Sequence, residues 1–412
     1  MIAKDVNDRT AVGPLARASQ PVGRAAVERR PSLLWVQTED LTQILDSATW
    51  LKTADELRAL GWDVFLVQPG PADSEPVLRD GLLYVPKPAT YFLGQRAFHR
   101  NVLKWLDAHG GVDVVMFHPL SVLWLSSARR ERGGKRPLLL MDIRTLFMRA
   151  AAPRLRDRFR AFYYEHINGL AQRWLDGYLA ITPHMATASG ISQERLLGVW
   201  PSGVDAGTFA PAAAARQWPA PGEPIRLVYI GSLHVERNLL GLSRAVVEAN
   251  RAGMNFQLLM VGRGSQQEEL AAFARQSGGA VEVRPAVPHS EVWKVLAETH
   301  VGVLPFPDEL KFRVSSPIKL FEYLAAGMPI LATRVVCHTD IVGNDPYAFL
   351  AASGEQDALV AALRELWAAR ARLPELGRQA MATTPQWTWQ ASAAKLDVAL
   401  RRALAQRAAA TR

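Results

Sequence analysis

The sequence predicts an α/β protein of two doubly wound, parallel-sheet domains facing a cleft. Three observations lead to this prediction. The 412 residues fit two or three domains at roughly 100–200 residues each. Short apolar runs alternate with helical segments along the chain, as in parallel sheets covered by helices on both faces. A stretch rich in Pro, Gly and Ala at 203–224 divides this alternation into two halves and is expected to be a linker.

In the first half, each apolar run predicts a strand and the segments between them predict helices. The expected strands are 31–37, 62–68, 81–86, 112–119, 137–143 and 178–183, and the expected helices are 48–60, 96–109 and 153–175. This first domain is expected to span 31–205 and to include a returning C-terminal helix at about 386–412. Residues 1–30 lack the apolar core of a signal peptide and predict a disordered tail.

The second half repeats the alternation and predicts a second domain at 206–385. The expected strands are 225–231, 256–262, 281–285, 301–306 and 329–334, and the expected helices are 239–251, a helix from 266, and 317–326. Ligands of such sheets bind beyond the carboxyl ends of the strands, so a site is expected there.

The composition limits the kinds of partner and the cellular location expected for the protein. A formal net charge of +9 would attract the phosphates of a nucleotide, a nucleic acid or an anionic membrane. The single cysteine, Cys337, excludes an intrachain disulfide. The sequence contains no run of about 18 apolar residues, so no transmembrane helix is predicted. We therefore expect a cytoplasmic protein that can lie at the inner face of the membrane.

The stretch SSPIKLFEYLAAGMPI predicts a short helix with charged groups near its start. Ser316 is expected as the N-cap and Gly327 as the left-handed residue after the last turn. The free amides of the helix start favour an anion, and Lys319 adds a positive charge. Glu322, one turn further on, suits the two hydroxyls of a ribose. The alternative is an ordinary amphipathic helix with both charges in solvent.

A second basic element, YIGSLHVERNLLGL, places a glycine turn between a strand and a helix. Gly231 and Ser232 allow close backbone approach. Arg237 could bind the same diphosphate through two hydrogen bonds, or it could be a surface arginine. The following VGRGSQQEEL lacks the third glycine of a dinucleotide fingerprint, so NAD binding is not predicted.

The order of YIGSL, VGRG, VRPAVPHSEV, VGVLPF and SSPIKLFEYLAAGMPILAT resembles the donor domain of GT-B glycosyltransferases, family 4 or group 1. GVWPSGVDAGTFAP and PQWTWQASAAKL resemble the interdomain and closing segments of that family. The resemblance covers about 198–396. Before that, only the architecture matches.

The resemblance implies a role for each matching residue. The catalytic set would be His118, Arg237 and Lys319, and the donor-binding set would be Gly231, Ser232, Arg237, Val287, Ser316, Lys319 and Glu322. Arg237 and Lys319 would hold the diphosphate, and Glu322 the ribose. Val287 would lie near the base, and His118 would face the donor sugar or else be a structural histidine at a strand end.

The sequence departs from the family at several positions. The first of two glutamates spaced eight residues apart is replaced by Val314; Asp308 or Glu309 could reach in from the preceding loop instead. Pro285 and Ala286 replace the usual glycine of the base-side loop. The Ser-Pro-x-Lys-x-x-Glu-Tyr pattern is that of a branch without the paired glutamates.

The activity implied is transfer of a sugar from a nucleotide diphosphate sugar to a saccharide or lipid-linked acceptor, with retention, in surface polysaccharide or glycolipid biosynthesis. No metal or other cofactor is expected, because no Asp-x-Asp motif is present. Two alternatives remain open: a UDP-sugar 2-epimerase and a non-catalytic nucleotide-sugar or glycan-binding protein. A nucleic-acid partner is not expected.

On the acceptor side, Asp142 and Arg144 follow a predicted strand and could contact the acceptor, or they could form a local ion pair. Arginines and aromatic residues gather in the segment after them, which suits an anionic membrane or, alternatively, a solvated helix face. These residues are Arg144, Arg149, Arg154, Arg156, Arg158, Arg160, Arg173, Phe159, Phe162, Tyr163, Tyr164 and Trp174. The segment 91–106 has a similar composition.

Overall fold

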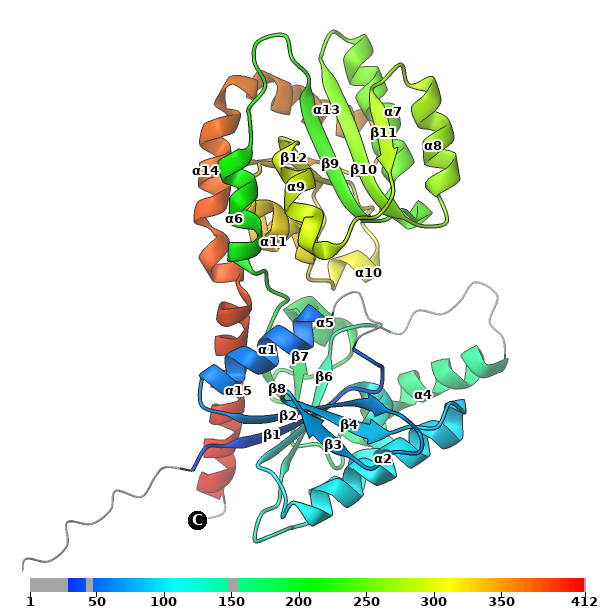
Figure 1. The fold of residues 1–412 in the computed structure, drawn as a ribbon, viewed down its shortest axis with the longest axis vertical. Helices are drawn as coiled ribbons and strands as arrows, with labels where there is room; N and C mark the ends of the chain where they lie inside the picture. The colour runs from blue at the N-terminus through cyan, green and yellow to red at the C-terminus, as the bar shows by residue number, and fades with distance from the viewer. Residues whose placement is uncertain (1–28, 42–46, 147–154, 411–412) are drawn as a thin grey trace, which may run out of the picture. The chain divides into compact units, whose positions relative to one another are not determined.

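Two parallel sheets covered by helices form the core of the computed structural model, which describes residues 29–41, 47–146 and 155–410 (Figure 1). The predicted α/β class with two doubly wound sheets is confirmed. The predicted tail lies outside the described residues apart from Arg29 and Arg30. Within the described part of the chain, no helix combines the length and apolar character needed to cross a bilayer.

The first sheet has the strand order β3-β4-β2-β1-β5-β6-β7-β8, and only the β3–β4 pair at its edge is antiparallel. Its strands are β1 (Ser32–Val36), β2 (Asp63–Gly70), β3 (Val77–Arg79), β4 (Leu82–Pro86), β5 (Val114–Phe117), β6 (Leu138–Ile143), β7 (Gly177–Ala180) and β8 (Leu196–Val199). The associated helices are α1 (Ala48–Ala59), α2 (Tyr91–Ala108), α3 (Val122–Leu125), α4 (Leu155–Ala171), α5 (Pro183–Ala188) and α15 (Trp389–Ala410), with 3-10 turns η1 (Pro119–Ser121) and η2 (Ser126–Arg129).

Both faces of this sheet are buried, which explains why its strands are continuous apolar runs. Side chains alternate between the faces along β1. Leu33 and Trp35 belong to one apolar cluster, and Leu34 and Val36 belong to another. The first cluster includes residues of α1 and the C-terminal helix α15, such as Leu400, so the last helix of the chain packs on the first sheet.

The second sheet is entirely parallel, with the order β11-β10-β9-β12-β13-β14. Its strands are β9 (Ile225–Ser232), β10 (Phe256–Arg263), β11 (Val281–Arg284), β12 (Val301–Leu304), β13 (Ile330–Thr333) and β14 (Ala348–Ala351). Its helices are α6 (Ala206–Ala215), α7 (Leu239–Arg251), α8 (Gln267–Gln276), α9 (Val292–Ala297), α10 (Leu310–Arg313), α11 (Ile318–Ala325), α12 (Val336–Val342), α13 (Gln356–Ala368) and α14 (Leu373–Ala382), with 3-10 turns η3 (Val235–Arg237), η4 (His289–Glu291), η5 (Arg370–Arg372) and η6 (Thr384–Trp387).

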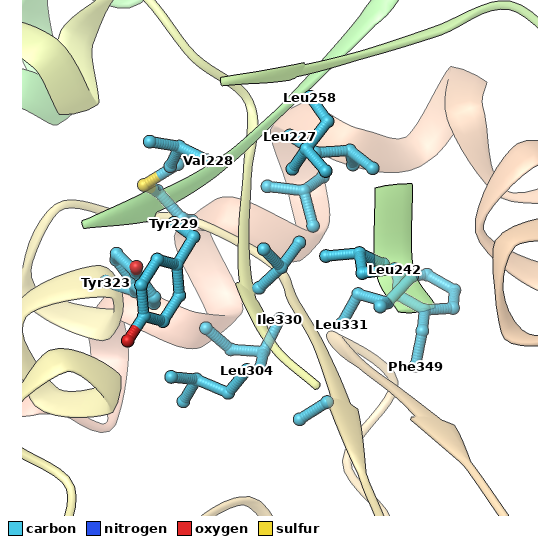
Figure 2. Packing of buried hydrophobic residues seen from close by; sticks show 14 of the residues in the cluster. Leu227, Val228, Tyr229, Leu242, Leu258, Leu304, Tyr323, Ile330, Leu331 and Phe349 are labelled. Atoms are coloured by element: carbon cyan, nitrogen blue, oxygen red, sulfur yellow. The ribbon is translucent and has the colours of Figure 1, made fainter. Parts of the chain in front are cut away.

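One apolar cluster fills this second half, and Figure 2 shows part of it. Strand residues such as Leu227 and Leu331 meet helix residues such as Leu242 in it. Tyr229 of β9 and Tyr323 of α11 lie near each other at one side of the cluster. Both hydroxyls hydrogen-bond to the backbone near the end of β9, Tyr323 to the Ile230 amide and Tyr229 to the Ser232 carbonyl.

The segment 203–224 is not a simple linker, and that prediction was wrong. It contains helix α6, whose first turn is capped by the Asp205 carboxylate accepting a hydrogen bond from the Gly207 amide at 3.1 Å. Phe209 is buried in the second core. Arg216 directly follows α6 and is buried, and its guanidinium donates to carbonyls at the C-terminal ends of α9 and α11. The segment is therefore part of the second core.

Candidate functional site

The end of β9 and the start of α11 lie together, and Lys319 lies directly over Gly231. A Cβ atom at Gly231 would be 2.2 Å from Lys319 Cε and 3.0 Å from its Nζ. Gly231 also has φ +149°, which L-residues rarely adopt. Glycine is required here for both reasons, and it places the ammonium group of Lys319 against the backbone at the carboxyl end of the strand.

Two tyrosines hold this arrangement in place. The Tyr323 hydroxyl of α11 accepts a hydrogen bond at 3.1 Å from the amide of Ile230, on β9. A Cβ at Gly302 would lie 2.3 Å from the Tyr323 ring, so this glycine makes room for it. The Tyr229 hydroxyl donates to the Ser232 carbonyl at 3.2 Å. Burial raises the pKa of Tyr229 to about 12, so it stays neutral.

Arg237 lies in the turn that follows β9. Its guanidinium carbon is 5.1 and 5.2 Å from the ring centres of Phe306 and Phe312. The positive charge of Arg237 favours the ionised form of the Tyr229 hydroxyl and so opposes the effect of burial on its pKa. Its Nε atom is buried and has no hydrogen-bond partner within the described residues. Stacking on two rings fixes the side chain while leaving hydrogen-bonding capacity.

Glu322 lies one turn after Lys319, and its side chain is only 11% exposed. Its Oε1 is 3.2 Å from Nε2 of His289, a residue in the 3-10 turn η4. The hydrogen bond with Glu322 raises the pKa of His289. We did not predict this contact from the sequence. Its signal would have been the histidine in VRPAVPHSEV, two residues after Val287.

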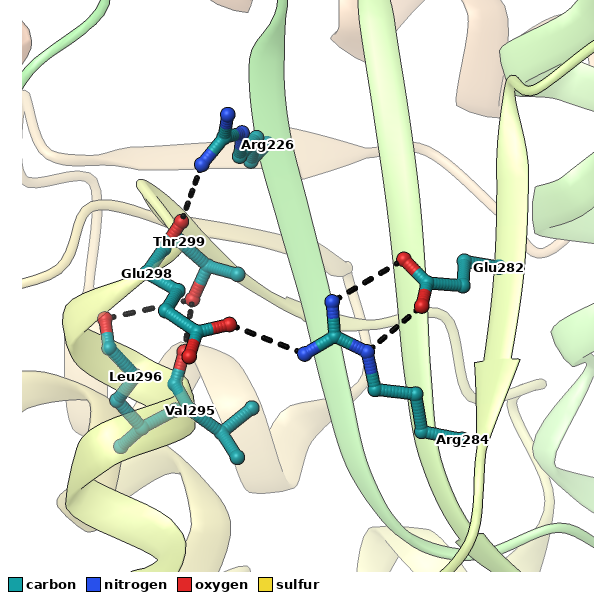
Figure 3. A network of polar contacts seen from close by, with 7 residues as sticks. All are labelled: Arg226, Glu282, Arg284, Val295, Leu296, Glu298 and Thr299. Atoms are coloured by element: carbon teal, nitrogen blue, oxygen red, sulfur yellow. Dashed lines mark hydrogen bonds and ion pairs between the residues drawn. The ribbon is translucent and has the colours of Figure 1, made fainter.

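The base-side loop is anchored at both ends by an ionic network around Arg284 (Figure 3). Arg284, at the end of β11, binds Glu282 at 2.7 Å and Glu298, just after α9, at 3.0 Å. The chain between these points carries Val287, which is half-buried against the second core, and His289. The network therefore limits where these two residues can lie.

Ser316 is not the N-cap of α11, so this prediction was wrong. The helix begins at Ile318, and Pro317 is the N-cap residue, with no side-chain cap. The Ser316 hydroxyl is one residue too early, and it accepts a hydrogen bond from the Ser202 amide at 3.1 Å. The predicted left-handed Gly327 is confirmed, with φ +65°.

Val314 occupies the position of the missing glutamate and is 3% exposed. It packs in an apolar cluster whose other members lie on the first sheet and the helices that cover it, and its carbonyl accepts a hydrogen bond from Thr182 Oγ1 at 2.8 Å. The two candidate replacements are engaged locally: Asp308 pairs with Arg313 at 2.6 Å, and Glu309 pairs with Lys311 at 2.8 Å. Neither carboxylate is free of a cationic partner in the structure.

His118 follows β5 and caps the turn η1. Its Nδ1 accepts a hydrogen bond from the Leu120 amide at 3.5 Å. Its Nε2 is 3.5 Å from the Thr145 hydroxyl. These contacts give the ring a local structural role. Its predicted contact with the donor sugar stays a prediction.

Asp142 and Arg144 meet around Trp200. The buried Asp142 accepts a hydrogen bond from the indole N–H of Trp200 at 3.0 Å, and burial raises its pKa to about 6. The Arg144 guanidinium stacks 3.7 Å from the Trp200 ring centre and donates to the Trp200 carbonyl. Both side chains thus have partners within the protein, and their contact with an acceptor stays a prediction.

The chain is similar to known glycosyltransferases. Residues 224–369 match the family described as glycosyl transferases group 1. A D-inositol 3-phosphate glycosyltransferase of Segniliparus rotundus is 29% identical over 50% of this chain, and the chain spans about half (47%) of that relative. A GDP-mannose-dependent alpha-(1-6)-phosphatidylinositol dimannoside mannosyltransferase of Mycobacterium tuberculosis is 26% identical, over 83% of this chain and 88% of the relative.

Solved structures share the fold. Anabaena Alr3699/HepE, solved in complex with UDP, superimposes with a TM-score of 0.68 over 90% of this chain and 100% of that chain, at 13% identity. At this identity the likeness concerns the fold alone. Residues 224–369 are therefore similar to the group 1 glycosyl transferases, and the fold is GT-B, with two parallel-sheet domains.

Proposed function

We propose that the protein transfers a sugar, with retention, from a nucleotide diphosphate sugar to a saccharide or lipid-linked acceptor in surface polysaccharide or glycolipid biosynthesis. The observation that carries this proposal is the position of Lys319 over Gly231, with Glu322 one turn further along the same helix. A cation against exposed backbone at a strand end suits a diphosphate, and a nearly buried carboxylate suits a ribose diol.

The difficult step of such a transfer is the departure of the diphosphate, on which negative charge develops. Lys319, Arg237 and the first amides of α11 would stabilise that charge, and this kind of electrostatic stabilisation is usually the largest catalytic term. Tyr323 would contribute by holding α11 against β9, so that these groups need not reorganise. Neither donor sugar nor base is assigned.

The test is release of nucleoside diphosphate from a panel of nucleotide sugars, with and without lipid-linked acceptors. Lys319→Ala and Glu322→Ala should each remove most of the release, with a loss in kcat of roughly 10²–10³-fold for the lysine. Arg275→Gln, a change at an exposed position on α8, is the control. Near-normal turnover in both site variants would contradict the site assignment. Isomerised donor would indicate an epimerase, and binding without turnover a non-catalytic protein.

We further propose that the first domain contacts an anionic membrane. On α2, Phe92 and Leu93 are 64% and 61% exposed. Arg96, Arg100 and Lys104 follow at four-residue spacing, and all three are exposed. Residues four apart share one helix face, so α2 presents two apolar side chains beside three cations.

Arg149 and Arg154 of the predicted basic segment lie outside the described residues, as do the side chains of Arg156, Phe159 and Arg160.

Vesicle sedimentation tests this contact. Arg96→Gln/Arg100→Gln should lower binding to vesicles containing phosphatidylglycerol by about 30-fold, because each of the two basic residues contributes about 1 kcal/mol near such a surface. The control Arg275→Gln/Arg364→Gln removes the same charge from exposed positions on the helices α8 and α13. Equal binding by the two double variants would contradict the role of α2.

A further inference from the structure

A pocket of about 360 Å³ opens in the first domain, lined by residues of the turn η2 and the segment after α4. The lining residues are Ser126, Ser127, Arg129, Arg130 and Trp174. None of them belongs to the candidate donor site or to the predicted acceptor residues. The pocket therefore needs a separate explanation.

The pocket is cationic. Arg129 and Arg130 are exposed, and neither guanidinium forms an ion pair or a hydrogen bond with any part of the chain that the structure describes. Arg132, two residues further on, differs from both: its guanidinium pairs with Asp107, and its side chain is only 9% exposed. Glu131 lies between them in sequence but does not line the pocket. With no carboxylate in the lining, the two charges add to a local positive potential.

The pocket also offers mostly hydrogen-bond donors. The Ser127 hydroxyl has no hydrogen bond within the described residues, whereas that of Ser126 donates to the Leu123 carbonyl at 3.3 Å. The indole N–H of Trp174 is itself buried, so it does not add to the donors that a ligand can reach. A lining of guanidinium and hydroxyl donors favours a ligand with several anionic oxygens.

We propose that this pocket binds a phosphate group, as a lipid headgroup phosphodiester or a soluble phosphate. Two guanidinium groups can each donate two hydrogen bonds to such a group. The volume is in the range of small-ligand sites, which leaves room for the group that the phosphate carries. Leu123 and Leu170, 44% and 45% exposed, lie one turn before Ser126 and Trp174 on the elements that border the pocket, so an attached apolar chain would meet apolar side chains there.

The experiment titrates the full-length protein with inorganic phosphate and, separately, with water-soluble dihexanoyl-phosphatidylglycerol, followed by calorimetry. We expect saturable binding of at least one probe. Arg129→Gln/Arg130→Gln should weaken it at least tenfold, and Arg129→Lys/Arg130→Lys should weaken it less, because charge is kept but the paired donors are lost. The control Arg275→Gln/Arg364→Gln should bind as the wild type does.

The two probes distinguish the sources. Binding of inorganic phosphate that needs Arg129 and Arg130 assigns the pocket to soluble phosphate, and binding of the lipid alone assigns it to a headgroup. No saturable binding of either probe, or an equal loss in both glutamine double variants, would overturn the proposal. Thermal unfolding verifies that the variants fold. This inference does not rest on the proposed transfer reaction: Arg129→Gln/Arg130→Gln should release nucleoside diphosphate at the wild-type rate, and pocket-dependent phosphate binding would stand even if no variant showed turnover.

Discussion

At the scale of single residues, Asp142 carries a carboxyl group whose ionised form the fold disfavours. It is buried beneath Trp200, and its pKa rises from 3.8 to about 6 because burial penalises the charge. Arg144 and the indole hydrogen bond oppose this shift without cancelling it. The native state therefore binds the Asp142 proton more tightly than the unfolded state does.

This shift predicts a pH-dependent effect of Asp142→Asn. The Asp142 carboxyl lowers the free energy of unfolding as pH rises from about 4 to about 6, whereas an amide does not ionise and can still accept the Trp200 hydrogen bond. The variant should gain stability relative to the wild type between pH 4.5 and pH 7.5, by about 2 kcal/mol. Urea unfolding at the two pH values measures this difference, and a difference that does not change with pH would contradict the assignment.

Single residues of the site were predictable where their chemistry stood in a motif. The sequence indicated Lys319 and Glu322 on one helix, and Gly231 and Arg237 beside a strand end. It did not indicate the contact of His289 with Glu322, because a pairing across 33 residues depends on tertiary packing. The N-cap of α11 was misassigned for a related reason: the Ser316 hydroxyl accepts a hydrogen bond from the amide of Ser202, which is distant in sequence.

At the scale of elements, the position of α11 against β9 decides where its charges lie. The Tyr323 hydroxyl is the acceptor for the Ile230 amide, and Gly302 leaves the space for the ring. This tie joins a helix to a strand end 93 residues away in sequence. It is therefore the contact to remove in order to test whether α11 is held rigidly.

Tyr323→Phe should lower the free energy of unfolding by roughly 1–3 kcal/mol, because the buried Ile230 amide would lose its acceptor while the ring still fills its space. The KM for the nucleotide sugar should rise as α11 loses its connection to β9. Chemical denaturation and steady-state kinetics measure the two effects. Unchanged stability together with unchanged KM would show that the hydrogen bond does not position the helix.

Helices and strands whose ends are marked by clear boundary residues were predictable from the sequence. The helix α7 has the predicted bounds, Leu239–Arg251, and most strands agree within a few residues. Helix α6 was missed because Pro, Gly and Ala resemble a loop in composition, although alanine is the strongest helix former and Asp205 is a good cap. Helix α2 begins at Tyr91, five residues before its predicted start at 96.

At the scale of the whole molecule, the alternation of apolar runs and helical segments was enough to predict two parallel sheets. The antiparallel edge pair β3–β4 was not predictable, because β3 is a short exposed strand, Val77–Arg79, without an apolar run. The pocket beside η2 was not predictable either, since its arginines and Trp174 come from separate segments. A sequence pattern describes a face or an element well, and a cavity between elements poorly.

We expect Lys319 to bind the diphosphate and Glu322 the ribose of a nucleotide sugar. Titration calorimetry with UDP and GDP, each compared with its nucleoside, separates the two contacts. For whichever diphosphate binds, Lys319→Ala should weaken affinity tenfold or more, since hydrogen bonds to charged groups contribute roughly 1.5–3 kcal/mol, and should leave nucleoside binding unchanged. Glu322→Ala should weaken both. Wild-type affinity for the diphosphate in Lys319→Ala would contradict this assignment.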